Sequence, residues 1–155
     1  MRRARAEDVD LVADLLEDAA RWLRSRGIDQ WPARFPRTIV AEHLLRRECY
    51  LAWDDGEAVG TFSLQPSDPE MWGERAADAL YLHGLAVRRS HAGLGRELLA
   101  WAETRAADTG KRYLRLDCMA ANAALRAYYE RAGFRHVGDR RSPGWGASLY
   151  EKAVR

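Results

Sequence analysis

Cysteine and lysine are scarce in this chain of 155 residues, and long apolar runs are absent. The two cysteines, Cys49 and Cys118, are too few for a disulfide framework or a cysteine metal cluster. No segment reaches the ~18 consecutive apolar residues of a membrane-spanning helix. The first residues also lack the apolar segment of a signal peptide. We therefore expect a cytoplasmic protein with no membrane partner.

The chain also lacks an excess of charge of either sign. The sequence holds 25 Lys and Arg against 23 Asp and Glu, which leaves a net charge of +2. This balance is too mild to indicate a nucleic-acid partner. Nearly all the cations are arginine, which we attribute to codon usage. The length indicates one domain, residues 1–155, and a hydrophobic content of 47% is enough for a core.

One stretch, residues 80–102, organises the rest of the chain. An apolar strand at 80–87 runs into a basic turn, and the turn opens a helix at 94–107. The first N–H groups of a helix lack intrahelical partners and lie at the positive end of its dipole. Gly93 and Gly95 let the backbone approach a ligand closely. The layout is typical of an anion-binding turn, although Gly-x-Gly alone identifies no ligand.

Hydrophobic periodicity predicts alternating helices and strands along the remaining chain. A helix of about 18 residues begins at Glu7-Asp8 and ends at Gly27. Asp54-Asp55-Gly56 is typical of a hairpin turn. The other predicted elements are helices at 38–47 and 122–132, strands at 1–6, 49–53, 58–64, 112–118, 134–138 and 148–154, loops at 28–37 and 65–78, and a turn at 143–146. Strands 80–87 and 112–118 should be parallel, because a helical crossover joins them.

Two segments resemble motifs of the GNAT-superfamily N-acetyltransferases. Residues 85–99 carry Leu-x-Val, then Gly-x-Gly and Leu-Leu, which is similar to the acetyl-CoA motif of that family. Residues 122–134 carry the pattern Asn-(x)6-Tyr-Glu-(x)2-Gly-Phe, which resembles its second signature. The resemblance covers nearly the whole domain in element order. It implies an α/β (α+β) fold with a mixed, mostly antiparallel sheet of about six to seven strands and about four helices.

The same resemblance implies acetyl transfer from acetyl-CoA to a primary amine by direct attack, without a metal. The turn and helix start would hold the pyrophosphate, and the strand edge would pair with the pantetheine arm. One N–H of that edge would stabilise the oxyanion. The residues so assigned to acetyl-CoA are Leu85, Ala86, Val87, Arg88, Arg89, Ser90, His91, Ala92, Gly93, Leu94, Gly95, Arg96 and Asn122. The acceptor would be a small-molecule or peptide amine, and a homodimer stays open.

The turn departs from the family pattern at Ser90, where Gln or Arg is usual. Arg88, Arg89 or His91 is available to replace it. Two alternatives therefore stay open, a non-catalytic acyl-CoA-binding module and a nucleotide- or dinucleotide-binding domain. The second alternative needs a third glycine, and the chain has Glu97 and Leu98 instead.

Two side chains are candidates for proton transfer. Tyr129 matches the family tyrosine that protonates the departing thiolate, and a phenol with a pKa near ~10 is a workable donor to a thiolate whose thiol has a pKa near ~8.5. The alternative is a core tyrosine, and we expect Tyr128 to be the packing member of the pair. His83 is a candidate general base, with an ordinary sheet histidine as the alternative. We expect Asp117 to be structural and Cys118 not to act as a nucleophile.

Aromatic side chains lie in the predicted loops. They would form either a wall for the amine acceptor or lids over the core. These residues are Trp31, Phe35, Trp72 and Trp145.

Overall fold

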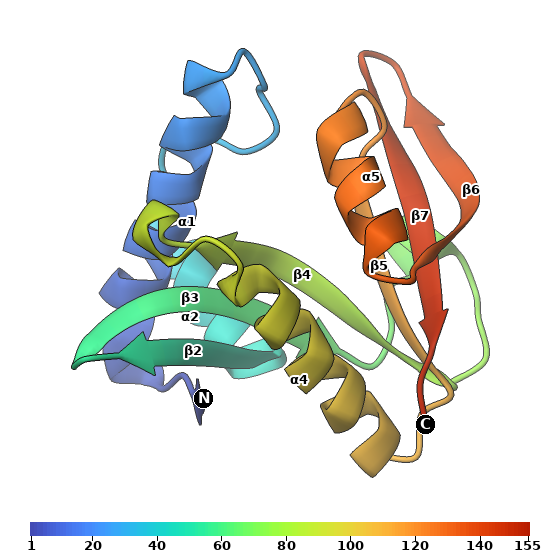
Figure 1. The fold of residues 1–155 in the computed structure, drawn as a ribbon, viewed down its shortest axis with the longest axis horizontal. Coiled ribbons are helices and arrows are strands. Elements are labelled where there is room, and N and C mark those ends of the chain that lie inside the picture. The colour runs from blue at the N-terminus through green and yellow to red at the C-terminus, as the bar shows by residue number, and fades with distance from the viewer. The chain divides into compact units, whose positions relative to one another are not determined.

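Strands β4 (Ala79–Val87) and β5 (Tyr113–Met119) run parallel and are joined by helix α4 (Leu94–Asp108). This pairing, seen in a computed structural model that describes residues 1–155, confirms the crossover prediction. Seven strands form one sheet in the order β1-β2-β3-β4-β5-β7-β6. The pairs β1–β2, β2–β3, β5–β7 and β6–β7 are antiparallel. The mixed, mostly antiparallel sheet with flanking helices is thus confirmed (Figure 1).

The other elements follow the chain order of Figure 1. They are β1 (Arg2–Arg3), the 3-10 helix η1 (Ala6–Asp8), α1 (Val9–Ser25), α2 (Arg37–Arg46), β2 (Glu48–Asp54), β3 (Glu57–Gln65), α3 (Pro69–Trp72), the 3-10 helix η2 (Arg89–His91), α5 (Ala123–Arg131), β6 (Arg135–Ser142) and β7 (Trp145–Ala153). No helix is both long and apolar enough to cross a lipid bilayer.

The chain divides into two compact units. The N-terminal unit comprises Met1–Leu64 and Gly84–Leu98, and the C-terminal unit comprises Gln65–His83 and Leu99–Arg155. Strand β4 and helix α4 contribute residues to both units.

The N-terminal unit is built on the amphipathic helix α1. Its apolar side chains recur at helical spacing and are buried together with Val40 of α2, Leu51 of β2 and Ala86 of β4. Figure 1 shows α2 behind the hairpin of β2 and β3. The hairpin prediction is confirmed, since Asp55 and Gly56 both have positive φ, at 48° and 79°, as a two-residue hairpin turn requires.

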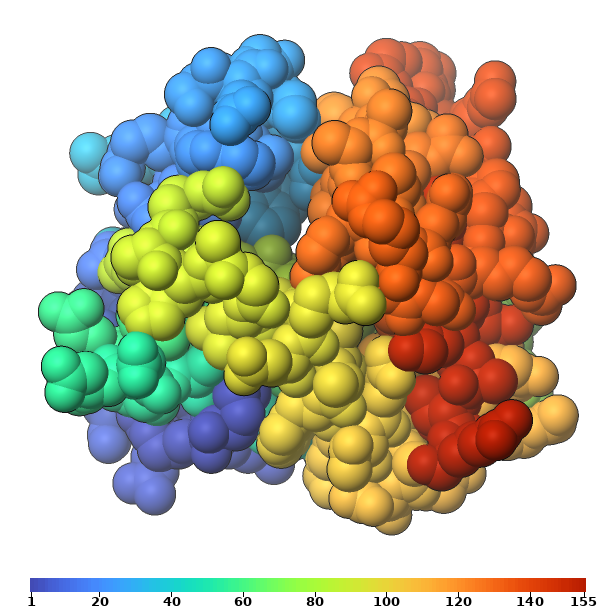
Figure 2. All heavy atoms as spheres, viewed as in Figure 1, coloured from blue at the N-terminus to red at the C-terminus, as the bar shows by residue number.

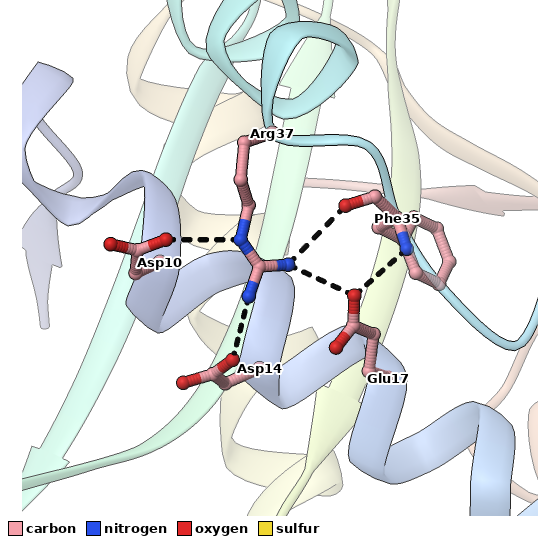
Figure 3. A network of polar contacts seen from close by, with 5 residues as sticks. All are labelled: Asp10, Asp14, Glu17, Phe35 and Arg37. Carbon is pink, nitrogen blue, oxygen red and sulfur yellow. Dashed lines mark hydrogen bonds and ion pairs between the residues drawn. The ribbon is translucent and has the colours of Figure 1, made fainter.

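Arg37 fastens the loop between α1 and α2 to α1 (Figure 3). Its guanidinium donates to carboxylates of Asp10, Asp14 and Glu17, at 3.0, 3.0 and 2.9 Å. The Glu17 carboxylate also accepts the backbone N–H of Phe35 at 2.9 Å, and this bond lowers the pKa of Glu17. The loop therefore leaves α1 along a defined path, with Phe35 held at its end.

In the C-terminal unit α5 packs against β7, where Tyr129 contacts Tyr150, and β7 lies between β5 and β6. Figure 1 shows α5 in front of β5, and in Figure 2 the atoms of α5 face the viewer on this side of the unit. A second cluster lies around α3, where the buried Trp72 ring packs on Tyr81 of β4 at 5.7 Å. Arg115 of β5 is buried in the same cluster and donates to the Tyr81 hydroxyl at 2.9 Å.

Several predicted boundaries were wrong. The N-terminal strand spans only Arg2–Arg3, because the chain then turns into η1, where the Asp8 carboxylate accepts the Arg5 N–H at 2.7 Å. The predicted loop 65–78 contains the short helix α3. Strands β6 and β7 are longer than expected, because a tight turn at 143–144 lets Ser142 pair directly with Trp145.

Candidate functional site

The glycine-bearing turn lies in the N-terminal unit, between β4 and α4. The Arg88 N–H donates to the Val59 carbonyl at 2.8 Å, and the His91 N–H donates to the Arg88 carbonyl at 2.9 Å. Gly93 has a φ of 99°, and a Cβ placed there would meet no atom within 4 Å. The backbone next to the start of α4 is thus open on the side where a side chain would stand, which fits a close approach by a phosphate.

The cationic side chains of the turn are engaged with neighbouring elements of the same unit. Arg88 pairs with Asp18 of α1 at 3.3 Å, and the Arg89 guanidinium stacks on the Trp22 ring at 3.8 Å. The Nε2 atom of His91 lies 2.8 Å from Asp54, and its Nδ1 atom lies 2.9 Å from the Ser90 hydroxyl.

Strand β4 extends beyond its pairing with β5. The parallel register runs from Ala79 opposite Tyr113 to Leu82 opposite Leu116, whereas β4 continues to Val87. Gly84 follows that point with a φ of 61°, which interrupts the regular pleat. Residues 85–87 thus form an extended segment beyond the ladder with β5. Such a backbone arrangement suits strand addition by a ligand with amide groups.

Helix α5 begins as the sequence predicts. The Asn122 side chain accepts the Leu125 N–H at 3.1 Å, which confirms the N-cap. Asn122 is itself buried.

Tyr129 is the more buried of the two adjacent tyrosines, with 5% of its surface exposed, contrary to the expectation that Tyr128 would pack. Its ring contacts those of Tyr128, Phe134 and Tyr150, with centroids 5.5, 5.9 and 6.2 Å away. Burial raises the pKa of Tyr129 well above its ordinary value, and the neighbouring Cys118 thiol adds to the shift. The phenol is therefore protonated at neutral pH.

His83 lies between two carboxylates of the C-terminal unit. Its Nε2 atom is 3.0 Å from the Asp68 carboxylate, and its Nδ1 atom is 4.0 Å from the Asp117 carboxylate. Burial raises the pKa of Asp117, with the Asp68 charge acting in the same direction and His83 against it. Ligand atoms of the three side chains lie within 4.8 Å of one another. Such a grouping suits an acid–base reaction or a bound cation, and the shorter distance is that of a close contact between a carboxylate and an imidazole.

Asp68 is the functional candidate that the sequence reasoning missed. It falls in the predicted loop 65–78, where nothing singled it out. The dipeptide Asp68-Pro69 is a helix-start signal that could have located α3. The pattern does not reveal that this carboxylate meets His83.

The four aromatic candidates have different settings. Trp31 and Phe35 lie in the loop after α1, contact each other edge-on at 6.1 Å and pack against the N-terminal core. Trp72 is not in a loop, since it ends α3 and is buried. Trp145 is not in a loop either, since it begins β7, and 47% of its surface is exposed. The packing of Trp72 is that of a core residue.

Neither cysteine is set up for nucleophilic chemistry. Burial raises the pKa of the Cys118 thiol to about 12 and that of the Cys49 thiol to about 11. A thiol with such a pKa has almost no thiolate at neutral pH. This agrees with direct transfer rather than a covalent enzyme intermediate.

Comparison with known proteins decides the family. The model of the acetyltransferase (GNAT) family matches residues 13–134, which include both the turn and Tyr129. The chain belongs to the acetyltransferase (GNAT) family. This GNAT-family chain is 33% identical to the uncharacterized N-acetyltransferase YesJ of Bacillus subtilis, over 96% of its own length and 86% of the relative's.

Solved structures agree with the assignment of the GNAT-family chain. A GNAT-family acetyltransferase from Listeria monocytogenes is 29% identical and superimposes with a TM-score of 0.81, over 99% of this chain and 93% of the other. YncA, a putative acetyltransferase from Salmonella typhimurium solved with acetyl-CoA, is 16% identical. Its TM-score is 0.70 over 99% of this chain and 92% of the other, which shows the shared fold.

Proposed function

We propose that this protein is an N-acetyltransferase that moves the acetyl group of acetyl-CoA to a primary amine by direct attack. The pairing of His83 with Asp68 at 3.0 Å carries the proposal, because it gives a GNAT-family strand a candidate base with an oriented imidazole. The acetyl-CoA bound to the Salmonella typhimurium relative supports the choice of donor. The acceptor is a small-molecule or peptide amine.

The turn supplies the proposed pyrophosphate site through its backbone. The N–H groups at the start of α4 would donate to phosphate oxygens, and the open space at Gly93 lets them come close. Arg88 and Arg89 add positive charge nearby, although both side chains are held by α1. If the backbone makes the main contacts with the phosphates, the site does not need the arginine or glutamine that the family usually has at the position of Ser90.

Two further segments have proposed roles toward the donor. The extended segment 85–87 would pair with the amides of the pantetheine arm, and one of its N–H groups would stabilise negative charge on the thioester oxygen. Asn122, whose carbonyl oxygen caps α5, would contact the arm through its remaining hydrogen-bonding groups.

The thioester provides an acetyl carbonyl that an amine can attack. In the proposed reaction the amine nitrogen forms the new C–N bond while the C–S bond breaks. His83, directly or through one water, takes the proton that the nitrogen loses. Tyr129 gives its phenolic proton to the departing sulfur. The products are an amide and the free thiol of coenzyme A.

Burial of Tyr129 bears on its proposed role in two ways. The raised pKa keeps the phenol protonated, so the donor form is the one present. The same apolar surroundings would disfavour a thiolate as strongly as a phenolate, so proton transfer to the sulfur stays feasible. Protonation of the leaving group is thus compatible with a buried phenol.

Release of thiol from acetyl-CoA tests the proposal, measured over a panel of alkylamines, polyamines, aminoglycosides and peptides. We expect release with at least one amine and loss of release when that amine is acetylated beforehand. Tight acetyl-CoA binding without release from any amine would favour the non-catalytic acyl-CoA-binding module. A thermal-shift comparison of acetyl-CoA with NAD and ATP addresses the nucleotide-binding alternative.

A further inference from the structure

We propose that the Asp68 carboxylate positions the imidazole of His83 for proton transfer, by keeping the ring proton on Nε2 and so leaving Nδ1 as the proton acceptor. This inference rests on the proposed function, in which His83 takes the proton of the acceptor amine. Asp68 acts through His83 and does not itself contact the reacting atoms. It is therefore a positioning residue.

The Asp68–His83 contact defines the tautomer. The carboxylate oxygen lies 3.0 Å from Nε2, at ion-pair distance, so a lone pair on that nitrogen would face the negative charge of Asp68. Nε2 must therefore carry the proton, and a neutral imidazole has only one N–H. Nδ1 is then the nitrogen with the free electron pair. Asp68 is only 9% exposed, so this electrostatic contact is shielded from water.

At the position of Asp68, an aspartate side chain usually caps a helix. It is the residue before Pro69, at the start of α3, where a carboxylate commonly accepts an N–H of the first helical turn. The Asp68 side chain makes no such bond. Only its backbone takes part in the helix, through its carbonyl, which accepts the Trp72 N–H at 2.8 Å. The side chain points to His83 instead.

A buried cluster holds both partners in place. The Trp72 ring, at the end of α3, packs on Tyr81, which lies two residues before His83 on β4. The Arg115 guanidinium lies over the Trp72 ring at 5.4 Å and donates to the Tyr81 hydroxyl. Helix α3 and strand β4 are thus joined next to the Asp68–His83 pair, which fixes the distance between them.

Asp117 of β5 is the second acidic group beside the ring. Its oxygen lies 4.0 Å from Nδ1, whereas the Asp68 oxygen lies 3.0 Å from Nε2. Burial raises the pKa of Asp117, so its ionised form is less favourable there than in water. Asp68, rather than Asp117, is therefore the group that orients the ring.

The tautomer can be measured directly by nitrogen NMR of histidine-labelled protein treated with EDTA. The His83 signals are assigned by their loss in His83→Gln. We expect the Nε2–H tautomer in the wild type and a substantial Nδ1–H fraction in Asp68→Asn, since the amide can donate as well as accept. An unchanged tautomer in Asp68→Asn overturns the inference. Should that variant fail to fold, Asp68→Glu, which keeps the acceptor charge, is expected to retain the Nε2–H form, and its loss would count equally against the inference.

Asp78→Asn is the matched control. Asp78 is another carboxylate of the same unit and pairs with the buried Arg115 at 3.2 Å. Its replacement should lower the unfolding midpoint without altering the His83 tautomer. A purely structural role for Asp68 would make the two variants behave alike.

Kinetics separate this inference from the proposed function. Asp68→Asn should lower kcat about 10- to 100-fold with little change in KM for acetyl-CoA. In a His83→Gln background Asp68→Asn should lower kcat no further. A double variant whose kcat falls by the product of the two single losses would contradict action through His83. If the wild type acetylates no amine, the proposed function fails, yet the NMR measurement still decides what Asp68 does to His83.

Discussion

The guanidinium carbon of Arg89 lies 3.8 Å from the centroid of the Trp22 ring, within the N-terminal unit. Together with the Arg88–Asp18 pair, this stack fastens the turn after β4 to helix α1. A guanidinium stacked on an indole in this way is stabilised by about 0.5–1 kcal/mol at an exposed site. The turn therefore has its backbone free and its cationic side chains occupied.

Gly93→Ala should weaken acetyl-CoA binding more than Arg89→Ala does. The φ of 99° at Gly93 is strained for any residue with a side chain, at a cost of about 1–3 kcal/mol, and relief of that strain moves the backbone N–H groups. Isothermal titration with acetyl-CoA measures the difference. The control is Gly110→Ala, since Gly110 also has a positive φ, 73°, and open space but follows the far end of α4. Equal loss of affinity in the two glycine variants would refute a backbone phosphate site.

Tyr129→Phe should leave acetyl-CoA affinity largely intact and lower turnover by about 100-fold or more, because the leaving thiolate loses its proton donor. The ring stays in the cluster with Phe134 and Tyr150, so the fold is kept. Thiol release under saturating substrates is the measurement. Tyr128→Phe, the neighbouring phenol, should retain normal turnover, and full activity in Tyr129→Phe would sink the assignment.

Trp72→Ala should lower the free energy of unfolding by about 3–5 kcal/mol, the usual cost of removing a large aromatic from a core. Trp72 is 5% exposed and contacts Tyr81 and Arg115. Trp145→Ala should lower the free energy of unfolding much less, because Trp145 is already 47% exposed to water. Urea unfolding of the two variants gives the comparison. A small effect at Trp72 would restore the interpretation of this residue as part of an acceptor wall.

Asp8→Asn should destabilise the protein near neutral pH by about 1 kcal/mol, because the neutral amide loses the charge that pairs with Arg2 while it can still accept the Arg5 N–H. Hydrogen bonds from Arg2, and the Arg5 N–H, hold the pKa of Asp8 below its usual value against the opposing effect of burial. Since the folded-state pKa is depressed, this stabilisation is complete above the unfolded value near ~3.9 and is lost as pH falls through the folded value.

Unfolding free energies of the wild type and Asp8→Asn should therefore differ at pH values above the unfolded pKa and converge at more acidic pH. Asp29→Asn is the control, because 85% of the Asp29 side chain is exposed. A difference that persists undiminished into strong acid would contradict the linkage of Asp8 ionisation to folding.

Local patterns determined much of the architecture before any tertiary contact was known. The Asp55-Gly56 turn, the Asn122 cap and the parallel pairing of β4 with β5 follow from backbone preferences, a side-chain hydrogen bond and a crossover rule that act over short stretches. The glycine turn and the 122–134 signature likewise identified the family, because both motifs are contiguous in sequence.

Only the tertiary structure brought Asp68 to His83 and separated the roles of the aromatic residues. Asp68 and His83 lie on different elements, and the packing of Trp72 on Tyr81 sets their distance. The engagement of Arg89 with Trp22 and the burial of Tyr129 also depend on neighbours that are remote in sequence or on side-chain packing. Sequence periodicity shows which faces are apolar, but it carries no information about which side chain meets which across two elements. For this reason the sequence determined the family and most elements, while the structure decided which side chains of different elements meet.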